Sequence, residues 1–323
     1  MSALLNKKYL PFYATVFVFI AIFLIGGAMY KNFLTTRVLG NILADNSFII
    51  IAAIGATFVI LSGGIDLSIG SMIGFVGVSM AVLDSMGWNP LATAVLMLAF
   101  GFAFGAFQGW VIDGLDIQPF IITLAGLFLL RGACFMVTIN SVPINHEWAD
   151  LYTDIKIRLP GKGLLRSSAI VMLVSLAIGI FVAHFTRFGT NVYALGGDKE
   201  SARLMGVNVR RTTVMVYAVA GLYSALAGVV YALYTKSGYP LAGSTLELSA
   251  IASVVLGGTL LTGGVGMVAG TLFGGMILGL ISTLIIFNGS LNSAWILISS
   301  GILLFAFIVL HRFLVGSFDH NRQ

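Results

Sequence analysis

The chain has 323 residues, of which 59% are hydrophobic and only 9% are charged. Soluble globular domains carry about 25% charged residues, so this composition excludes a soluble fold and indicates a chain whose apolar surface lies in a bilayer. The net charge of +5 is spread over short loops, which is typical of residues that set membrane topology and argues against a nucleic-acid-binding surface. We therefore expect an all-α polytopic membrane protein with one transmembrane domain over residues 1–323.

A membrane-spanning helix needs about 20 mostly apolar residues, and about ten segments approach this requirement, some of them short. The first follows Lys7 and Lys8; it is long for the apolar part of a signal peptide and no cleavage site follows it, so we expect a retained helix. The predicted spans are residues 11–30, 47–62, 67–83, 91–112, 119–139, 168–186, 213–234, 247–262, 266–287 and 293–314.

Two pairs of spans are separated by only a few residues. Residues 62–66 lie between the second and third spans, and residues 262–264 lie between the eighth and ninth. Either pair can contain a broken or re-entrant helix, because irregular backbone is tolerated at membrane depth where protein surrounds it.

These two segments form an internal repeat. Residues 61–74 and 261–274 align without a gap, and the first copy keeps these identical residues: Leu61, Gly63, Gly64, Gly70 and Gly74. Transporters often contain parallel or inverted repeats, and the alternative is chance similarity between two glycine-rich helices. The retained glycine spacing favours a repeat. The span count makes it parallel, and one miscounted span would make it inverted.

Basic residues in short loops predict the orientation of the chain. The segment 187–212 contains Arg187, Lys199, Arg203, Arg210 and Arg211. The span count places this segment and both termini on one side, which we expect to be the cytoplasm. The loop 140–167 then lies on the periplasmic side, and its cations are offset by Glu147, Asp150 and Asp154.

The sequence contains no motif for nucleotide hydrolysis or metal catalysis. A phosphate-binding loop needs Gly-Lys followed by Ser or Thr, but Gly161-Lys162 is followed by Gly163. Clustered cysteines and histidines, an HExxH motif and a Gly-x-Ser-x-Gly elbow are also missing from the sequence. We expect no cofactor, no metal and no enzymatic activity in this chain, and the scarcity of acidic residues along the spans disfavours a proton-coupled carrier.

Asp66 and Arg131 are the clearest ionisable residues within the spans. Such a residue costs about 2.5–3.5 kcal/mol on insertion scales, so it normally faces a partner or water. Asp66 either caps the third helix by accepting backbone N–H bonds or takes part directly in transport. Arg131 either extends its charge toward the interface or pairs with a carboxylate.

A short helix is predicted after Asp198, which is a good N-cap. Residues 199–205 favour helix, and Gly206 is placed to end it in the left-handed conformation. A helix of about two turns is unstable alone in water, so one that presents apolar residues needs a surface on which to dock. The alternative is a basic loop that only fixes topology.

Four segments resemble signature sequences of the permease subunits of sugar-importing ATP-binding-cassette transporters, the ribose, xylose and galactose group. They are residues 62–71, residues 119–124 with 131–132, residues 193–197 with 202–207, and residues 257–259 with 263–266. Residues 141–146 further resemble the galactofuranose importer, in which two different permease chains pair. Gln108-Gly109 and Gln118-Pro119 depart from the Asn-Gly and Pro-Pro of the family.

The resemblance implies a permease of the bacterial inner membrane that translocates a monosaccharide, galactofuranose or a similar sugar. It implies three partners beside membrane lipid: a cytoplasmic ATP-binding subunit, a second permease chain of different sequence, and a periplasmic sugar-binding protein. The candidate residues of the substrate pathway are Asp66, Ser68, Ser71, Gln108 and Arg131. The candidate residues of the ATPase-coupling segment within loop 187–212 are Asp198, Ala202, Arg203, Leu204, Met205 and Gly206.

Two other classes compete with this interpretation. A self-sufficient secondary carrier or facilitator of a small polar solute would need no partner, and a membrane-embedded enzyme would need a catalytic constellation. A capped docking helix without a phosphate-binding loop favours a permease that is driven by another subunit.

The topology can be tested by labelling introduced cysteines in a Cys134→Ser background. A membrane-impermeant reagent should reach a cysteine at Asn145 from outside the cell. A cysteine at Asn191 should react only after the cytoplasmic side has been opened. The reversed pattern would overturn the span count.

Overall fold

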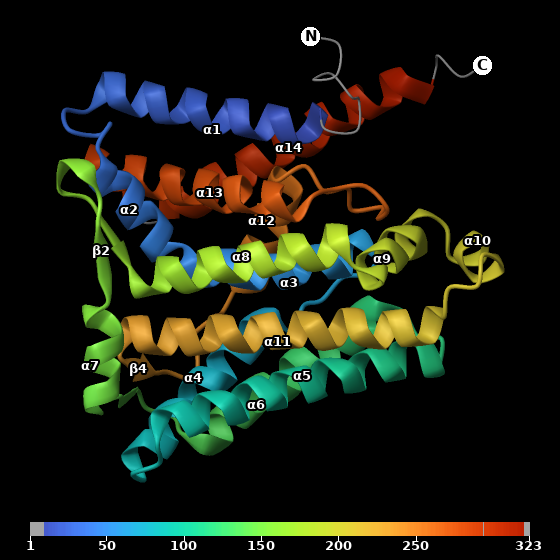
Figure 1. Ribbon diagram of the computed structural model, residues 1–323. Coiled ribbons are helices and arrows are strands. Elements are labelled where there is room, and N and C mark those ends of the chain that lie inside the picture. The colour runs from blue at the N-terminus through green and yellow to red at the C-terminus, as the bar shows by residue number, and fades with distance from the viewer. Residues whose placement is uncertain (1–9, 293, 320–323) are drawn as a thin grey trace.

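The helices of the computed structural model, which describes residues 10–292 and 294–319, run side by side between two ends of the molecule (Figure 1). Six are long and apolar enough to cross a membrane. They are α1 (Leu10–Met29), α5 (Pro90–Gly114), α6 (Pro119–Val137), α8 (Ser167–Phe185), α11 (Val209–Thr235) and α13 (Val268–Asn288). The predicted all-α membrane fold is therefore confirmed.

The second predicted span, residues 47–62, is α3 (Ser47–Leu61). A helix that was not predicted from the sequence, α2 (Thr36–Asp45), precedes it, and the two meet at an angle of 58°. Asn46 causes the break, because its side chain donates to the Ile42 carbonyl at 2.8 Å and its backbone leaves the helical conformation. If this pair is one span, the described residues contain seven by length and composition. The shorter apolar helices α4 (Ile69–Ser85) and α12 (Leu246–Leu256), and the apolar stretch Ala294–Phe307 of α14 (Ala294–Asp319), occupy the other predicted positions. The count of ten stays a prediction.

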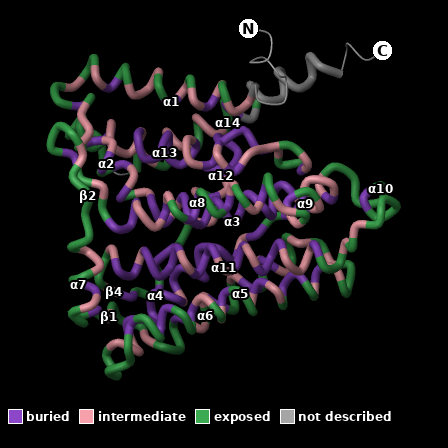
Figure 2. The backbone as a smooth tube through the Cα atoms, viewed as in Figure 1, coloured by how far each residue is buried: buried purple, intermediate pink, exposed green. Residues whose placement is uncertain are grey.

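Helices α3 and α11 form the centre of the bundle. Helix α3 is apolar on every side and almost all of its residues are buried, as expected for a helix surrounded by other helices (Figure 2). Helix α11 packs against α3, α4 and α5. Helices α1 and α6 lie at the periphery, and large apolar side chains on them remain exposed, as lipid-facing residues would be.

Both copies of the internal repeat turn at the same end of the bundle and touch each other. Gly264 donates its N–H to the Leu61 carbonyl at 2.9 Å, and the hydroxyls of Thr57 and Thr271 lie 2.8 Å apart. Because α3 and α12 both run into these turns, while α4 and α13 both run out of them, the two copies are parallel. This agrees with the orientation that the span count predicts.

The end of α9 (Arg187–Gly197) meets these turns. The first part of segment 187–212 was predicted to be a loop, and this prediction is wrong, because it forms helix α9. Thr186 caps this helix, and Val192 and Leu195 are buried. A Cβ atom at Gly196 would lie 1.7 Å from the Leu61 carbonyl oxygen and 2.6 Å from the Gly264 nitrogen. Three segments therefore meet backbone to backbone, and we call Leu61–Gly64, Gly196 and Gly263–Gly264 the glycine junction.

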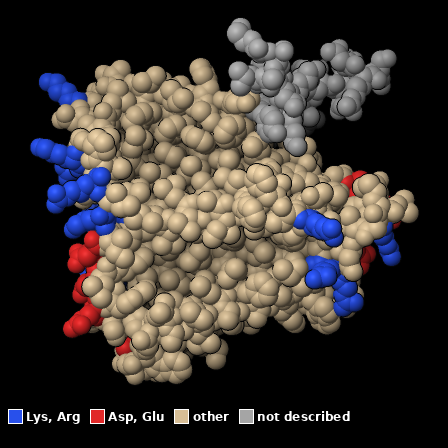
Figure 3. Space-filling model, viewed as in Figure 1, with Lys and Arg blue, Asp and Glu red and all other residues tan. Residues whose placement is uncertain are grey.

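The opposite end of the molecule carries α7 (Glu147–Asp154) and four short strands. Strand β1 (Val142–Pro143) pairs with β4 (Ser237–Gly238), and β2 (Lys156–Arg158) pairs with β3 (Leu164–Arg166) around the short 3-10 turn η3 (Pro160–Lys162). The predicted loop 140–167 thus has structure of its own. Charged residues gather at this end and at the α10 end, with an uncharged belt between them (Figure 3). Lys7, Lys8 and Arg322, which support the predicted position of the termini, lie outside the described residues.

The glycine junction predicts that Gly196→Ala destabilises the protein by about 1–3 kcal/mol, as overpacking does, because the new methyl group collides with backbone that cannot turn away. Gly197→Ala is the matched control, since a Cβ atom there meets nothing within 4 Å. Thermal unfolding of the purified variants measures the difference. Equal midpoints for the two variants would contradict the close approach.

Candidate functional site

The turn between α3 and α4 places a carboxylate inside the bundle. Gly63 has a φ of +83°, which lets the chain leave α3 abruptly. Asp66 follows and is only 4% exposed. Its Oδ1 accepts hydrogen bonds from the Ser68 backbone N–H at 2.8 Å and from the Ser68 hydroxyl at 2.7 Å. Asp66 thus holds the turn just before α4, but the N-cap of that helix is Ser68, so Asp66 does not cap the helix as the first alternative predicts.

Gln108 reaches this turn from α5. The Ser68 hydroxyl lies 3.3 Å from Gln108 Oε1, and the Ser71 hydroxyl donates to the Ser68 carbonyl at 2.8 Å. Gln108 is buried, and its Nε2 has no hydrogen-bond partner among the described residues. Leaving a buried donor unpaired costs about 1–3 kcal/mol, so this amide is suited to donate to an oxygen of a passing ligand. The structure therefore brings together four of the candidate residues, Asp66, Ser68, Ser71 and Gln108.

Two further hydroxyls face the same turn. Tyr217 Oη of α11 and Thr123 Oγ1 of α6 lie 3.5 Å and 3.4 Å from the Ile65 carbonyl oxygen. Thr123 belongs to a segment that carries the family resemblance, so it could have been proposed from sequence. Tyr217 lies in an ordinary apolar span, and nothing in the sequence marks it.

A cavity of about 560 Å³ leads from this turn to the α10 end of the molecule. Its inner wall contains Gly63, Gly64 and Tyr217, and its mouth contains Asp116 and Lys199, which are exposed and lie 3.9 Å apart. The volume is within the range of about 300–1,000 Å³ that is usual for small-molecule sites. The cavity therefore opens the first residues of the turn to one side of the molecule, while Asp66, Ser68 and Gln108 lie behind its wall and do not line it.

Arg131 of α6 lies apart from this group, further along α4. Its Nη1 donates to the Pro240 carbonyl at 2.6 Å and to the Ala242 carbonyl at 2.8 Å. The guanidinium thus neither extends to the interface nor pairs with a carboxylate, the two alternatives predicted from the sequence. It binds the irregular segment before α12 instead, because the carbonyl groups of that segment need hydrogen-bond donors. Glu247, at the start of α12, lies nearby and was missed. An acidic residue that opens an apolar run is the signal that could have found it.

The predicted coupling helix is α10 (Lys199–Leu204), and both of its caps form. Asp198 accepts from the Ser201 N–H at 2.7 Å. At the other end Gly206 has a φ of +86°, and its N–H donates to the Arg203 carbonyl at 3.0 Å. Val207 donates to the Ala202 carbonyl at 3.0 Å, which completes a Schellman motif.

Hydrogen bonds from the Ser201 side chain and backbone lower the pKa of the exposed Asp198 carboxyl. The contribution of this cap to stability is therefore present at neutral pH and is lost as the pH falls through the folded-state pKa.

Helix α10 exposes two large apolar side chains. Leu204 is 88% exposed and Met205 is 72% exposed, and Arg203 lies on the surface beside them. Ala202 faces inward and is fully buried, so it anchors the helix to its own chain. Of the three apolar coupling residues predicted from the sequence, only Leu204 and Met205 are therefore exposed.

A multi-pass bundle of apolar helices, with a cavity open at one end and a short exposed helix beside that opening, is the architecture expected of a membrane permease. Residues 38–308 match the family described as the permease component of the branched-chain amino acid transport system, and the chain belongs to that family. The resemblance to sugar permeases of ATP-binding-cassette importers is also confirmed by the relatives that the chain matches over most of its length.

The chain is 51% identical over 318 residues to the inner membrane ABC transporter permease protein YjfF of Escherichia coli K12, which covers 98% of this chain and 96% of YjfF. It is 38% identical over 280 residues to the ribose import permease RbsC of the same strain, covering 86% of each chain. It is 32% identical over 314 residues to the fructose import permease FruG of Bifidobacterium longum, covering 95% of this chain and 92% of FruG. No solved structure matches the chain significantly.

The position of Gln108 can be tested through Gly126 of α6. A Cβ atom there would lie 2.2 Å from Gln108 Nε2, so Gly126→Ala should displace this flexible amide while the backbone stays in place. We expect several-fold slower uptake by the assembled importer at normal membrane abundance. Gly132→Ala on the same helix meets nothing within 4 Å and is the control. Equal uptake by both variants would remove Gln108 from the path.

Proposed function

We propose that this chain is the membrane-spanning subunit of a bacterial inner-membrane sugar importer that is powered by a separate ATP-binding subunit. The observation that carries the proposal is α10, which is capped at both ends and exposes Leu204 and Met205 beside the mouth of the cavity. A helix this short persists through its caps and its contacts, and two exposed apolar residues at its end are suited to enter a groove on a partner.

The glycine junction connects this docking helix to the path. Helix α9 leads directly into α10, and Gly196 near its end touches the turn that carries Asp66. The Tyr193 hydroxyl also donates to the Gly266 carbonyl at 2.9 Å, which ties α9 to the second turn. Displacement of α10 by the ATP-binding subunit is therefore delivered to both turns of the repeat.

The substrate is a neutral monosaccharide, galactofuranose or a similar sugar. The path presents a carboxylate, hydroxyls and an amide in a confined space, and these groups exchange hydrogen bonds with sugar hydroxyls. Support for the sugar class comes from the names of RbsC and FruG. Support for galactofuranose comes from the resemblance of residues 141–146, together with the similarity to YjfF.

A complete importer needs further chains. A second permease of different sequence and membrane lipid share the exposed apolar surface, which includes Phe128, Leu129 and Met136 on α6. A periplasmic sugar-binding protein docks at the end that carries α7 and the β2–β3 hairpin. Both termini lie in the cytoplasm, and the chain itself binds neither cofactor nor nucleic acid. A self-sufficient carrier would leave the exposed end of α10 without a role.

The proposal predicts that Leu204→Asp uncouples the importer, because an unpaired carboxylate would enter the subunit contact. Membrane insertion and the melting temperature should be unchanged, while co-purification of the ATP-binding subunit and sugar-stimulated ATP hydrolysis fall about tenfold or more, equivalent to at least about 1.4 kcal/mol. Glu200→Gln, on the same exposed helix, is the matched control.

Two further variants grade the effect. Gly206→Val should act like Leu204→Asp, since a β-branched residue is disfavoured at a φ of +86°. Asp198→Ala should be milder, because it removes one cap and leaves the Schellman motif in place. If Leu204→Asp inserts normally and still supports full sugar uptake, the segment is only a topology loop.

A further inference from the structure

The chain between α11 and α12 forms an irregular strap that enters the bundle from the α7 end. Its first residues form β4, which pairs with β1 of the external loop. Its later residues reach the first turn of α4, where a Cβ atom at Gly70 would lie 2.3 Å from the Gly243 carbonyl oxygen. The strap therefore runs from the external end to the depth of Ser68 and Ser71. It lies where the polar path would have to continue outward.

Small residues of α4 receive this strap. A Cβ atom at Gly74 would lie 2.6 Å from the Ala242 carbonyl oxygen, and one at Gly238 would lie 2.4 Å from the Gly77 carbonyl oxygen. The strap itself is conformationally strained, since Thr245 has a φ of +71° although it is β-branched. A strained segment on a smooth helix face needs a separate interaction to hold it.

Arg131 supplies that interaction. Its Nη1 binds two carbonyls of the strap, at Pro240 and Ala242, with charge-assisted hydrogen bonds of 2.6 Å and 2.8 Å. The guanidinium forms no ion pair with a carboxylate within the described residues.

A buried carboxylate, that of Glu247, lies where the strap meets the first turn of α4. Glu247 Oε2 is buried and has no hydrogen-bond partner among the described residues, and it would lie 2.0 Å from a Cβ atom at Gly70. A cation that binds carbonyls next to an unpaired buried carboxylate has a second partner available. A second arrangement of Arg131, paired with Glu247, would release the strap.

We propose that residues 239–245 are the external gate of the path, that Arg131 holds this gate closed, and that Glu247 accepts the guanidinium when the gate opens. The inference rests on the proposed function, because it assigns the outer closure of the same path. Arg131 and Glu247 are positioning residues in this scheme, and they act on the strap.

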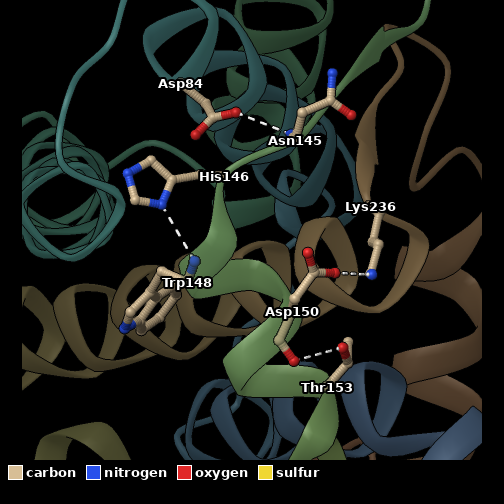
Figure 4. Close-up of polar contacts among 7 residues, drawn as sticks. All are labelled: Asp84, Asn145, His146, Trp148, Asp150, Thr153 and Lys236. Atoms are coloured by element: carbon tan, nitrogen blue, oxygen red, sulfur yellow. Dashed lines mark hydrogen bonds and ion pairs between the residues drawn. The ribbon is translucent and has the colours of Figure 1, made fainter.

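The external loop contacts both the start of the strap and the outer end of α4 (Figure 4). Lys236, the first residue of the strap, forms an ion pair with Asp150 of α7, and its carbonyl accepts from the Ile144 N–H at 2.9 Å. Asn145 donates its N–H to Asp84 at the outer end of α4 at 3.1 Å. A protein that docks on α7 would thus press on the strap and on the helix beneath it.

Cysteine shielding tests the gate without any partner subunit or substrate. Ser71→Cys, in a Cys134→Ser background, places a thiol behind the strap at a fully buried position. It should resist a membrane-impermeant thiol reagent added from outside. Arg131→Gln should raise its labelling rate at least tenfold, and Arg131→Lys, which keeps charge and donors, should give an intermediate rate. Arg158→Gln, which removes an exposed external cation, should leave the thiol shielded.

Two measurements separate gating from misfolding. Thr213→Cys, which lines the cytoplasmic cavity, should be labelled from the cytoplasmic side at the same rate with and without the Arg131→Gln substitution. Glu247→Gln should keep Ser71→Cys shielded and should not lower the melting temperature, while uptake falls several-fold because the open arrangement has lost its acceptor.

Either of two results overturns the gate: continued shielding in Arg131→Gln, or full uptake by Glu247→Gln. Failure of the proposed function would appear separately, as a Leu204→Asp importer that still transports sugar.

Discussion

Backbone groups that leave a helix inside a membrane must find hydrogen-bond partners within the protein, because lipid offers none. Most of the unusual features of this chain follow from that constraint. The turn after α3 is satisfied partly by the turn after α12, through the bond from Gly264 to Leu61, and partly by the Asp66 carboxylate. The Thr15 hydroxyl donates to the last carbonyl of α12, Leu256, at 2.6 Å.

The same constraint explains where ionisable residues are tolerated. Asp66 and Arg131 do not pair with each other; each binds backbone or hydroxyl groups of a segment that has no regular secondary structure. Their charges fix irregular backbone in place, and that irregular backbone lies along the path. Under the proposed function, the polar groups that hold the fold also form the surface that a sugar would meet.

Local patterns predicted the local features well. The apolar runs located α5, α6, α8 and α13 to within a few residues, and the spacing from Asp198 to Gly206 predicted both caps of α10. These features depend on neighbours in the sequence, whose chemistry is visible there. The repeat was also predictable, since its two copies keep their glycines in register.

Features that depend on distant partners could not be predicted in the same way. The burial of Ala202 depends on how α10 lies against its own chain, so a run of apolar residues was interpreted as one surface. The partners of Arg131 are carbonyls more than a hundred residues away, which no spacing rule reaches. Tyr217 and Glu247 could not be singled out from sequence, because only the packing of α11 and α12 brings them to the turn before α4 and to its first residues. The amphipathic spacing of Phe188, Val192 and Leu195 did carry the signal for α9, and the charges around it obscured that signal.

The glycine junction also bears on how quickly this protein can change shape. Tightly packed helices normally move past one another only when interdigitated side chains change rotamer. At Gly196, Gly263 and Gly63 the surfaces in contact are main chain, without side chains to disengage. At this contact no side chain has to change rotamer before α9 can slide by a small distance. The hydrogen bonds that cross the junction then limit how far α9 moves.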